Sequence, residues 1–288
     1  MIWHDLRDPN DPQLDALAAE FHLHPLHIED CRHDRQRAKV EEGADYIFVV
    51  LKPVHVTSEG EVSITELDIF LGRDYVITVQ HGDCPTVRAA LDQLHTTAAK
   101  VRADQLFYKI LDSTVDAHTP ALDWFNEKID DIEDKVLEAP SPAMLEGIFE
   151  AKRGLIELRR VLSNTRDVAS HLQRLETDLI EHDLLPFLRD VYDHLARDMD
   201  MVEMQRDLLS NAMDIYLSSV ANRTNQVMKV LTILGTVALP AIVISGFYGM
   251  NTKDLPGVNS PHGTLIAVGL MVASTAVLLY LLRKFDWL

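Results

Sequence analysis

A short polar segment separates two uncharged apolar runs near the end of the chain, and it contains Gly249, Met250 and Asn251. Mg²⁺ gives up its water shell reluctantly, so a selective site can hold the hydrated ion through neutral oxygens. The Asn251 side chain and the Gly249 carbonyl offer such oxygens. Repeated around a symmetry axis, these three residues are predicted to form an ion selectivity filter.

The flanking apolar runs have the length and composition of membrane-spanning helices. Residues 230–247 carry no charge over 18 positions, and residues 264–282 carry none over 19. A hydrocarbon core of roughly 30 Å needs about 20 apolar residues. A buried hairpin of a soluble protein is the alternative, because core helices can be apolar on every face. We predict transmembrane helices over 228–249 and 264–282.

Basic side chains indicate how these helices cross the bilayer. Lys229 precedes the first span, and Arg283 and Lys284 follow the second. The positive-inside rule then places both termini in the cytoplasm, residues 250–263 outside as a loop, and residues 283–288 inside as a basic tail. The first eleven residues contain Asp5, Asp8 and Asp11 and no apolar run, so we expect no secretory signal there.

A long helix is expected to lead into the first span. Residues 187–234 contain neither Gly nor Pro, the residues that most disfavour a helix interior. Helical from Pro186 to Gly249, the segment would be about 95 Å long at 1.5 Å per residue. Its apolar residues recur in steps of three and four, as in the seam of a helix bundle. We predict a stalk over 186–227 and a symmetric oligomer.

In such an oligomer, one face of the first span would line an axial pore. Because the span is apolar, its axis-facing side chains would close the pore by dewetting, and a polar residue at the inner end could meet the ion. For any single Leu or Met, contact with lipid or another helix is the alternative. The predicted pore and gate residues are Asn225, Met228, Leu231, Gly235, Leu239 and Ile242.

The first part of the chain has the pattern of an α+β domain, a small sheet flanked by helices. Runs rich in Val, Ile, Phe and Tyr predict strands, and helical spacing on either side predicts covering helices. The expected strands are 46–54, 66–71 and 75–79, and the expected helices are 12–22 and 85–99. This cytoplasmic α/β subdomain is assigned to residues 1–102, and a hairpin of long helices to residues 103–185.

The charge of the chain is unevenly distributed. Residues 225–288 hold four of the 27 basic and two of the 45 acidic residues, which leaves a formal balance of −20 on residues 1–224. Such a surface repels nucleic acid and attracts cations, so no nucleic-acid partner is expected. A membrane-anchored enzyme would need a catalytic signature, and the sequence has no GxSxG, GxxxxGK[ST] or HExxH. A coiled-coil anchor would not explain the polar loop.

Taken together, these segments resemble the CorA family of magnesium transporters over nearly the whole chain. The family is marked by Tyr-Gly-Met-Asn between two C-terminal membrane helices, which stands here at Tyr248–Asn251. Residues 224–232 are similar to the family's pore-helix entry. Similar blocks in the soluble part are His24–Leu26, Ile28–Asp30, Gln36–Arg37, Lys39–Glu41, Arg159–Arg160 and Arg189–His194.

The resemblance implies a homopentamer in a bacterial inner membrane, with a funnel-shaped cytoplasmic domain whose stalk helices become the inner pore helices. It implies a channel for Mg²⁺, with Co²⁺ and Ni²⁺ as further cargo, that closes when intracellular Mg²⁺ binds between subunits. Asp112 and Asp116 lie four residues apart and so share a helix face. The regulatory carboxylates that the resemblance implies are Glu29, Asp30, Asp112, Asp116 and Asp190.

A zinc transporter of the same superfamily, with or without proton coupling, is the alternative. The segment Leu255–Gly257 is closer to the zinc-transporting branch. His22, His24, His27 and His33 would also suit Zn²⁺ better than Mg²⁺, because imidazole is a borderline ligand and Mg²⁺ prefers oxygen. The sequence therefore leaves the ion preference open.

Overall fold

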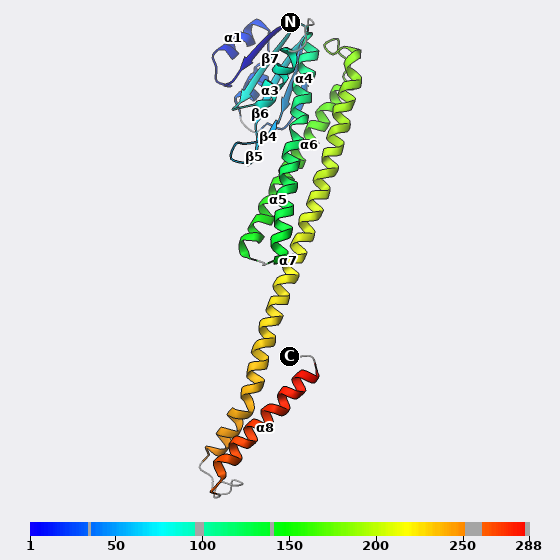
Figure 1. The fold of residues 1–288 in the computed structure, drawn as a ribbon. Coiled ribbons are helices and arrows are strands. Elements are labelled where there is room, and N and C mark those ends of the chain that lie inside the picture. Colours follow the sequence, from blue (N-terminus) through cyan, green and yellow to red (C-terminus); the bar gives the residue numbers. More distant parts are fainter. Residues whose placement is uncertain (34–35, 96–100, 139–140, 251–260, 286–288) are drawn as a thin grey trace. The chain divides into compact units, whose positions relative to one another are not determined.

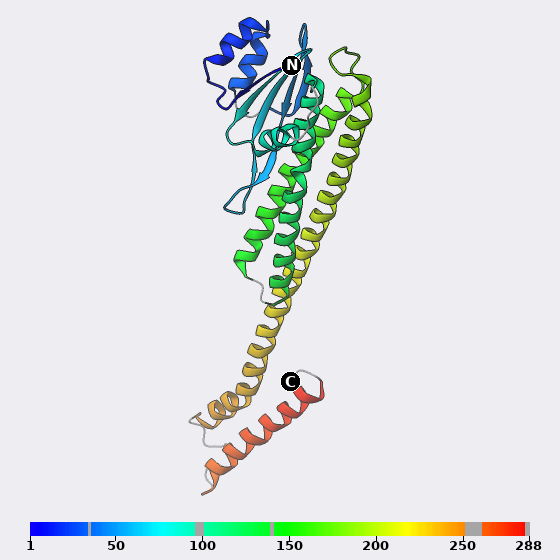
Figure 2. The same cartoon turned by 45° about the horizontal axis from the view of Figure 1, so that its top comes forward.

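The computed structural model describes residues 1–33, 36–95, 101–138, 141–250 and 261–285, and it divides into two compact units, Met1–Asp214 and Ile215–Leu288 (Figures 1 and 2). The strands are β1 (Ile2–Leu6), β2 (Lys39–Glu42), β3 (Tyr46–Leu51), β4 (Val54–Val56), β5 (Val62–Ile64), β6 (Glu66–Gly72) and β7 (Tyr75–His81). The helices are α1 (Gln13–Glu20), α2 (Pro25–Arg32), α3 (Pro85–His95), α4 (Ala103–Asp116), α5 (His118–Glu138), α6 (Pro142–Leu172), the short η1 (His182–Leu184), α7 (Leu185–Tyr248) and α8 (Gly263–Lys284).

The first unit is built around a five-stranded sheet in the order β1-β7-β6-β3-β2. β1 runs parallel to β7, and the other neighbours are antiparallel. Every residue of β3 and β6 is buried, as expected for central strands that are covered on both faces. The α+β fold class predicted from the sequence is therefore confirmed.

Alternation along the strands assigns side chains to the two faces of the sheet. Phe48, Phe70 and Ile77 join one apolar cluster with residues of α1 and α2, among them Leu14 and Ile28. α4 packs against β6 and β7, and the two views place α1 and α4 on opposite sides of the sheet (Figures 1 and 2). The face of the sheet that lies below α2 also carries polar side chains.

The first unit also contains helices α3 to α6, η1, the first part of α7 and a two-stranded sheet of β4 and β5. The fully buried Gln205 of α7 donates a hydrogen bond from Nε2 to the Leu122 carbonyl of α5 at 2.8 Å. Gln173, just after α6, donates to the Leu188 carbonyl of α7 at 3.3 Å. These bonds satisfy buried polar groups and hold α7 against α5 and the end of α6.

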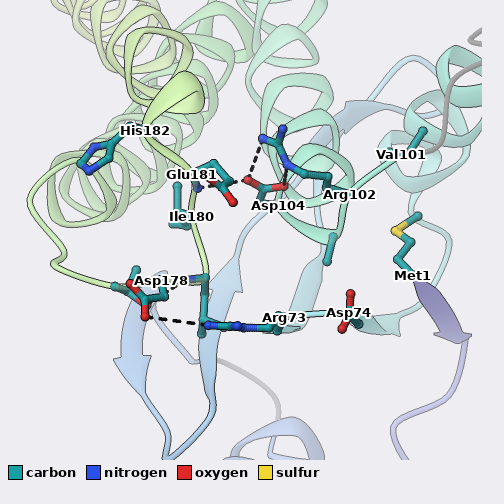
Figure 3. Close-up of a pocket in the computed structure, with 13 residues that line it drawn as sticks. Met1, Arg73, Asp74, Val101, Arg102, Asp104, Asp178, Ile180, Glu181 and His182 are labelled. Atoms are coloured by element: carbon teal, nitrogen blue, oxygen red, sulfur yellow. Dashed lines mark hydrogen bonds and ion pairs between the residues drawn. The ribbon is translucent and has the colours of Figure 1, made fainter.

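A polar pocket of about 510 Å³ lies where α4 begins (Figure 3). Arg102 donates to both oxygens of Asp104 at 3.0 Å and to both oxygens of Asp183 at 2.7 and 3.0 Å. These two carboxylates raise the pKa of Arg102. Asp104 also accepts the backbone N–H of Glu181 at 3.1 Å. The contacts of Arg102 and Asp104 with Asp183 and Glu181 therefore connect the start of α4 to the segment before α7.

The second unit consists of the end of α7 and of α8. Each contains a window apolar enough to cross a membrane, with mean hydropathy 2.2 and 2.4. α7 continues through Pro240, which removes one backbone donor from the helix. Thr224, Thr232 and Thr236 donate their hydroxyls to carbonyls four residues earlier. Their polar groups are thereby satisfied without water, as a hydrocarbon environment requires.

A close contact between α5 and α6 gives a test of this packing. A Cβ atom on Gly154 would lie 2.7 Å from Cζ of the buried Phe125, whereas nothing lies within 4 Å of one on Gly147 in the same helix. Gly154→Ala should therefore lower the free energy of unfolding by about 1–3 kcal/mol. Gly147→Ala, the matched control, should leave it unchanged or raise it by up to about 1 kcal/mol. Thermal unfolding of the detergent-solubilised protein measures both, and equal effects would contradict the packing.

Candidate functional site

The predicted pore residues lie together on one helix, α7. Asn225, Met228, Leu231, Gly235, Leu239 and Ile242 are all exposed in the single chain, and their spacing of three and four residues places them on one face. The Leu231 side chain is 62% exposed and Ile242 is 64% exposed. Apolar side chains this exposed require lipid or other protein around them.

The predicted filter begins where α7 ends. Gly249 follows the last helical residue, Tyr248, and its N–H donates to the Ser245 carbonyl at 2.8 Å. Met250 comes next and is exposed, and Asn251 lies outside the described residues. The described part of the filter therefore stands at the C-terminal end of the proposed pore face.

Three of the predicted regulatory carboxylates gather at the surface between α4 and α7. Burial raises the pKa of Tyr108, and the negative charges of Asp112, Asp190 and Asp116 raise it further. Desolvation by the surrounding protein and the nearby Asp112 carboxylate raise the pKa of Asp116. A carboxylate with a raised pKa resists holding its negative charge, so a cation placed here would relieve the repulsion.

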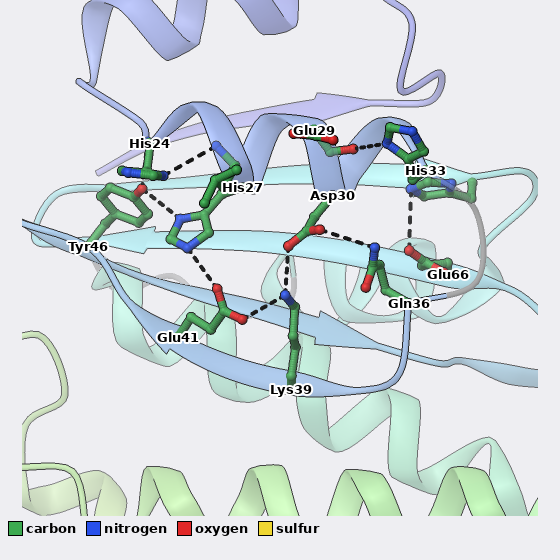
Figure 4. A network of polar contacts seen from close by, with 12 residues as sticks. His24, His27, Glu29, Asp30, His33, Gln36, Lys39, Glu41, Tyr46 and Glu66 are labelled. Carbon is green, nitrogen blue, oxygen red and sulfur yellow. Dashed lines mark hydrogen bonds and ion pairs between the residues drawn. The ribbon is translucent and has the colours of Figure 1, made fainter.

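The other two predicted carboxylates lie on α2, in a different polar network (Figure 4). Asp30 accepts from Lys39 Nζ at 2.6 Å and from Gln36 Nε2 at 3.1 Å. The Glu29 side chain is exposed. Among the described residues, neither residue belongs to a group with the carboxylates of α4 and α7 in which the ligand atoms all lie within 4.8 Å of one another. One chain therefore does not bring the five predicted ligands into one site.

The four histidines considered as zinc ligands do not converge either. His24 caps α2, where its Nδ1 accepts from the Leu26 N–H at 3.2 Å, and His33 donates to the Glu29 carbonyl at 2.8 Å. His22 adopts a positive φ of 54° in the turn after α1. His27 is buried between Tyr46 and Glu41. Each ring that has a recorded hydrogen bond serves a local structural role.

One group of three metal-binding side chains does occur in the part of the chain that the structure describes, and sequence reasoning missed it. Glu66, Asp68 and His81 each offer an atom within 4.8 Å of the others. Glu66 and Asp68 alternate along an otherwise apolar buried strand. The sequence did contain a signal for this group. Two charged residues at alternate positions of an apolar run are unusual, because burying a charge is costly unless it has a partner.

The sequence matches a family described as CorA-like Mg2+ transporter protein over residues 1–284. The chain belongs to this family. It is 36% identical over 272 residues to the cobalt/magnesium transport protein CorA of Thermotoga maritima, covering 93% of this chain and 78% of that protein. The family consists of transporters, and with the two apolar helices this identifies the chain as a membrane protein with two spans.

Solved structures agree with this assignment. The CorA magnesium transporter of Methanocaldococcus jannaschii superimposes with a TM-score of 0.87 at 26% identity, over 99% of this chain and 91% of that one. The ZntB cytoplasmic domain from Vibrio parahaemolyticus gives 0.65 at 13% identity over 77% of this chain and 88% of that one, a likeness of fold alone. The CorA-like chain therefore has the fold of a full-length transporter.

His27 provides a pH test of the α2 network. Burial lowers its pKa from the usual 6.5, although Glu41 opposes the shift. The Tyr46 hydroxyl donates to Nδ1 at 2.8 Å and Nε2 donates to Glu41 at 3.0 Å, the pattern of a neutral ring. Because the unfolded chain binds this proton more readily, the stability present above pH 6.5 is lost as the pH falls through the folded pKa.

We therefore expect that His27→Gln reduces the acid-dependent fall in unfolding temperature, while the exposed His171→Gln leaves it unchanged. Thermal unfolding across a pH series measures this. An identical pH dependence in wild type and His27→Gln would show that His27 is not the responsible group.

Proposed function

We propose that the chain is one subunit of a homopentameric channel that conducts Mg²⁺ down its electrochemical gradient, with Co²⁺ and Ni²⁺ as further cargo. The observation that carries the proposal is α7, a helix whose second half presents an exposed apolar face and ends at the Gly-Met-Asn segment. The relative from Thermotoga maritima is named a cobalt/magnesium transport protein, and the superimposed archaeal protein a magnesium transporter.

Around the axis of such an oligomer, α7 supplies both filter and gate. Asn251 side chains and Gly249 carbonyls, with Met250 between them, offer neutral oxygens to a hydrated ion at the mouth. Met228, Leu231, Leu239 and Ile242 then form an apolar constriction that conducts only when it is wet, with Gly235 between them. Asn225 supplies a polar ring at the inner end.

Intracellular Mg²⁺ controls this gate from between the cytoplasmic domains. Glu29 and Asp30 of one subunit face Asp112, Asp116 and Asp190 of the next, and Mg²⁺ joins the two sets. Their separation within one chain supports a site between chains. Acidic neighbours repel one another when the ion is absent, and the subunits then loosen and shift the equilibrium toward the open pore.

The channel lies in a bacterial inner membrane with both termini in the cytoplasm. Arg283 and Lys284 form the last turn of α8, and Lys229 lies in α7 just before the first apolar window. Positive side chains at these ends favour the cytoplasmic side of the membrane. The acidic domain then faces the compartment whose Mg²⁺ it would sense.

The filter is tested by ion flux into proteoliposomes that contain either a Mg²⁺ dye or a Zn²⁺ dye. Wild type should admit Mg²⁺, and Asn251→Ala should abolish the flux because it removes the side-chain oxygen. Asn211→Ala, an exposed position in the soluble part of α7, should leave the flux unchanged. Entry of Zn²⁺ alone would instead support a zinc transporter, and the absence of flux for either ion would refute the channel.

The regulatory carboxylates are tested by the same flux at high internal Mg²⁺, where the wild-type channel should be closed. Asp112→Asn/Asp116→Asn keeps the side-chain shape but removes the charge that holds the closing ion, so this variant should continue to conduct. Asp123→Asn, an exposed residue of α5, is the control and should close like wild type. Closure of the double variant at wild-type Mg²⁺ concentrations would exclude these carboxylates from the sensor.

A further inference from the structure

A polar corner interrupts the apolar face of the sheet that lies below α2. On β6, Phe70 belongs to the apolar cluster, and the preceding residues of the same face are Asp68 and Glu66. On β7, Val79 belongs to that cluster, and the next residue of the same face is His81. Side chains two apart on a strand share a face, so the three polar groups continue one buried layer.

Strand register brings these groups together. Glu66 pairs directly with His81 across the antiparallel ladder, and Asp68 pairs with Val79. His81 Nε2 lies 2.9 Å from Asp68 Oδ2 and 4.0 Å from Glu66 Oε1. Lys52 contacts the other Glu66 oxygen, Oε2, and Figure 4 shows Glu66 at the end of the network away from Tyr46.

Burial makes this corner different from an acidic patch on the surface. Asp68 is 0% exposed and Glu66 is 4% exposed. Asp68 Oδ1 accepts no hydrogen bond of normal geometry from the described residues. An unsatisfied oxygen of a buried carboxylate is costly, because the charge has lost its water without gaining a full set of donors. The Cys31 thiol, a weak donor, is a neighbour of this carboxylate, so the oxygen remains open to a cation.

A buried thiol on α2 lies beside this corner. Cys31 is fully buried and belongs to the apolar cluster of the same face. Burial and the neighbouring Asp68 carboxylate raise the pKa of its thiol. Cys31 is not one of the three side chains whose ligand atoms all lie within 4.8 Å of one another, so its sulfur would have to move toward them to bind the same ion. The corner thus combines an imidazole and two carboxylates on β6 and β7, and a thiol on α2 is next to Asp68.

We propose that Asp68, His81 and Glu66 form a buried site for a divalent cation of borderline softness such as Zn²⁺ or Co²⁺, and that the neighbouring Cys31 thiol moves toward the bound ion as its fourth donor. Nitrogen and sulfur ligands suit these ions, whereas Mg²⁺ prefers oxygen alone. The site is separate from the pore and from the five carboxylates proposed as the Mg²⁺ sensor, and it does not depend on the transport function.

The proton balance of binding follows from the contacts. The ion takes the Nε2 lone pair of His81, so the proton that Nε2 shares with Asp68 moves to the other ring nitrogen or to solvent. Coordination by sulfur also requires Cys31 to lose its proton to solvent. No oxidant or other reactant is needed. Binding therefore releases protons and weakens as the pH falls.

Occupancy would join α2 to the two strands beneath it. Cys31 directly follows Asp30 and Glu29, the α2 carboxylates in the proposed sensor. An ion that bonds Cys31 to β6 and β7 would fix the end of α2 and hence the position from which those carboxylates reach a neighbouring subunit. Under the proposed sensor mechanism, binding of Zn²⁺ or Co²⁺ here would then change the affinity of the sensor for Mg²⁺.

The test titrates Co²⁺ into the detergent-solubilised, metal-stripped full chain and records the ultraviolet thiolate-to-cobalt charge-transfer band. Only coordination by sulfur gives this band, so Co²⁺ at oxygen-only sites does not contribute. We expect the band in wild type and in Cys84→Ser, the matched control at the other buried cysteine, and its loss in Cys31→Ser. Zn²⁺ should abolish the band, and excess Mg²⁺ should not.

Asp68→Asn, nearly isosteric, should weaken Co²⁺ binding at least about tenfold, as expected when a metal site loses a charged partner. Wild-type protein at saturating Co²⁺ that shows no band would overturn the site, whether or not the variants fold. A band that persists in Cys31→Ser, or unchanged affinity in Asp68→Asn, would overturn the ligand assignment. Circular dichroism of each variant confirms that its fold is retained.

Discussion

The structure depends on one constraint, which is that the second half of α7 is apolar on its exposed surface. The helix satisfies its own backbone, and its threonine hydroxyls bond to carbonyls of the preceding turn. The helix is therefore compatible with a bilayer, whereas exposing its apolar surface to water would cost free energy. Lipid can cover the outward side. The face that carries Leu231, Leu239 and Ile242 becomes a conduction path only when copies of the same helix surround an axis.

Residues 1–224 face the opposite physical problem, because negative charge accumulates there. Some of this charge is neutralised within the chain, as at Asp30, which pairs with Lys39. The carboxylates around Tyr108 are only partly compensated, because Lys109 lies 3.6 Å from Asp112 whereas Asp116 has a raised pKa. An interface between such surfaces is weak without a cation and stronger with one. This difference is the property that a cation sensor requires.

The elements that the sequence predicted well are those with strong local patterns. The continuous helix α7 is confirmed, and three apolar runs appear as β3 with β4, β6 and β7. β2 was missed because its sequence, Lys-Val-Glu-Glu, has no such pattern. The break between α4 and α5 at Ala117 is followed by Pro120 in the first turn of α5, a helix-start signal that the sequence analysis did not use.

The same difference between local sequence patterns and long-range contacts applies to the candidate site. Spacing on a single helix was enough to place the six residues predicted to line a pore on one face of α7. Contacts between distant strands were not readable, so the corner formed by Glu66, Asp68 and His81 was overlooked in favour of histidines that are close in sequence. The regulatory carboxylates stay predictions, because the expected contacts between them lie between chains. The domain boundaries stay predictions as well.

The most direct measurement of the central claim compares Ile242→Cys with Ile244→Cys. Two positions apart on a helix, the side chains point in nearly opposite directions, and the native cysteines are buried. A membrane-impermeant cationic thiol reagent should block Mg²⁺ flux through Ile242→Cys and leave Ile244→Cys unaffected. Block at Ile244→Cys alone, or at neither position in a conducting channel, would contradict a pore lined by this face of α7.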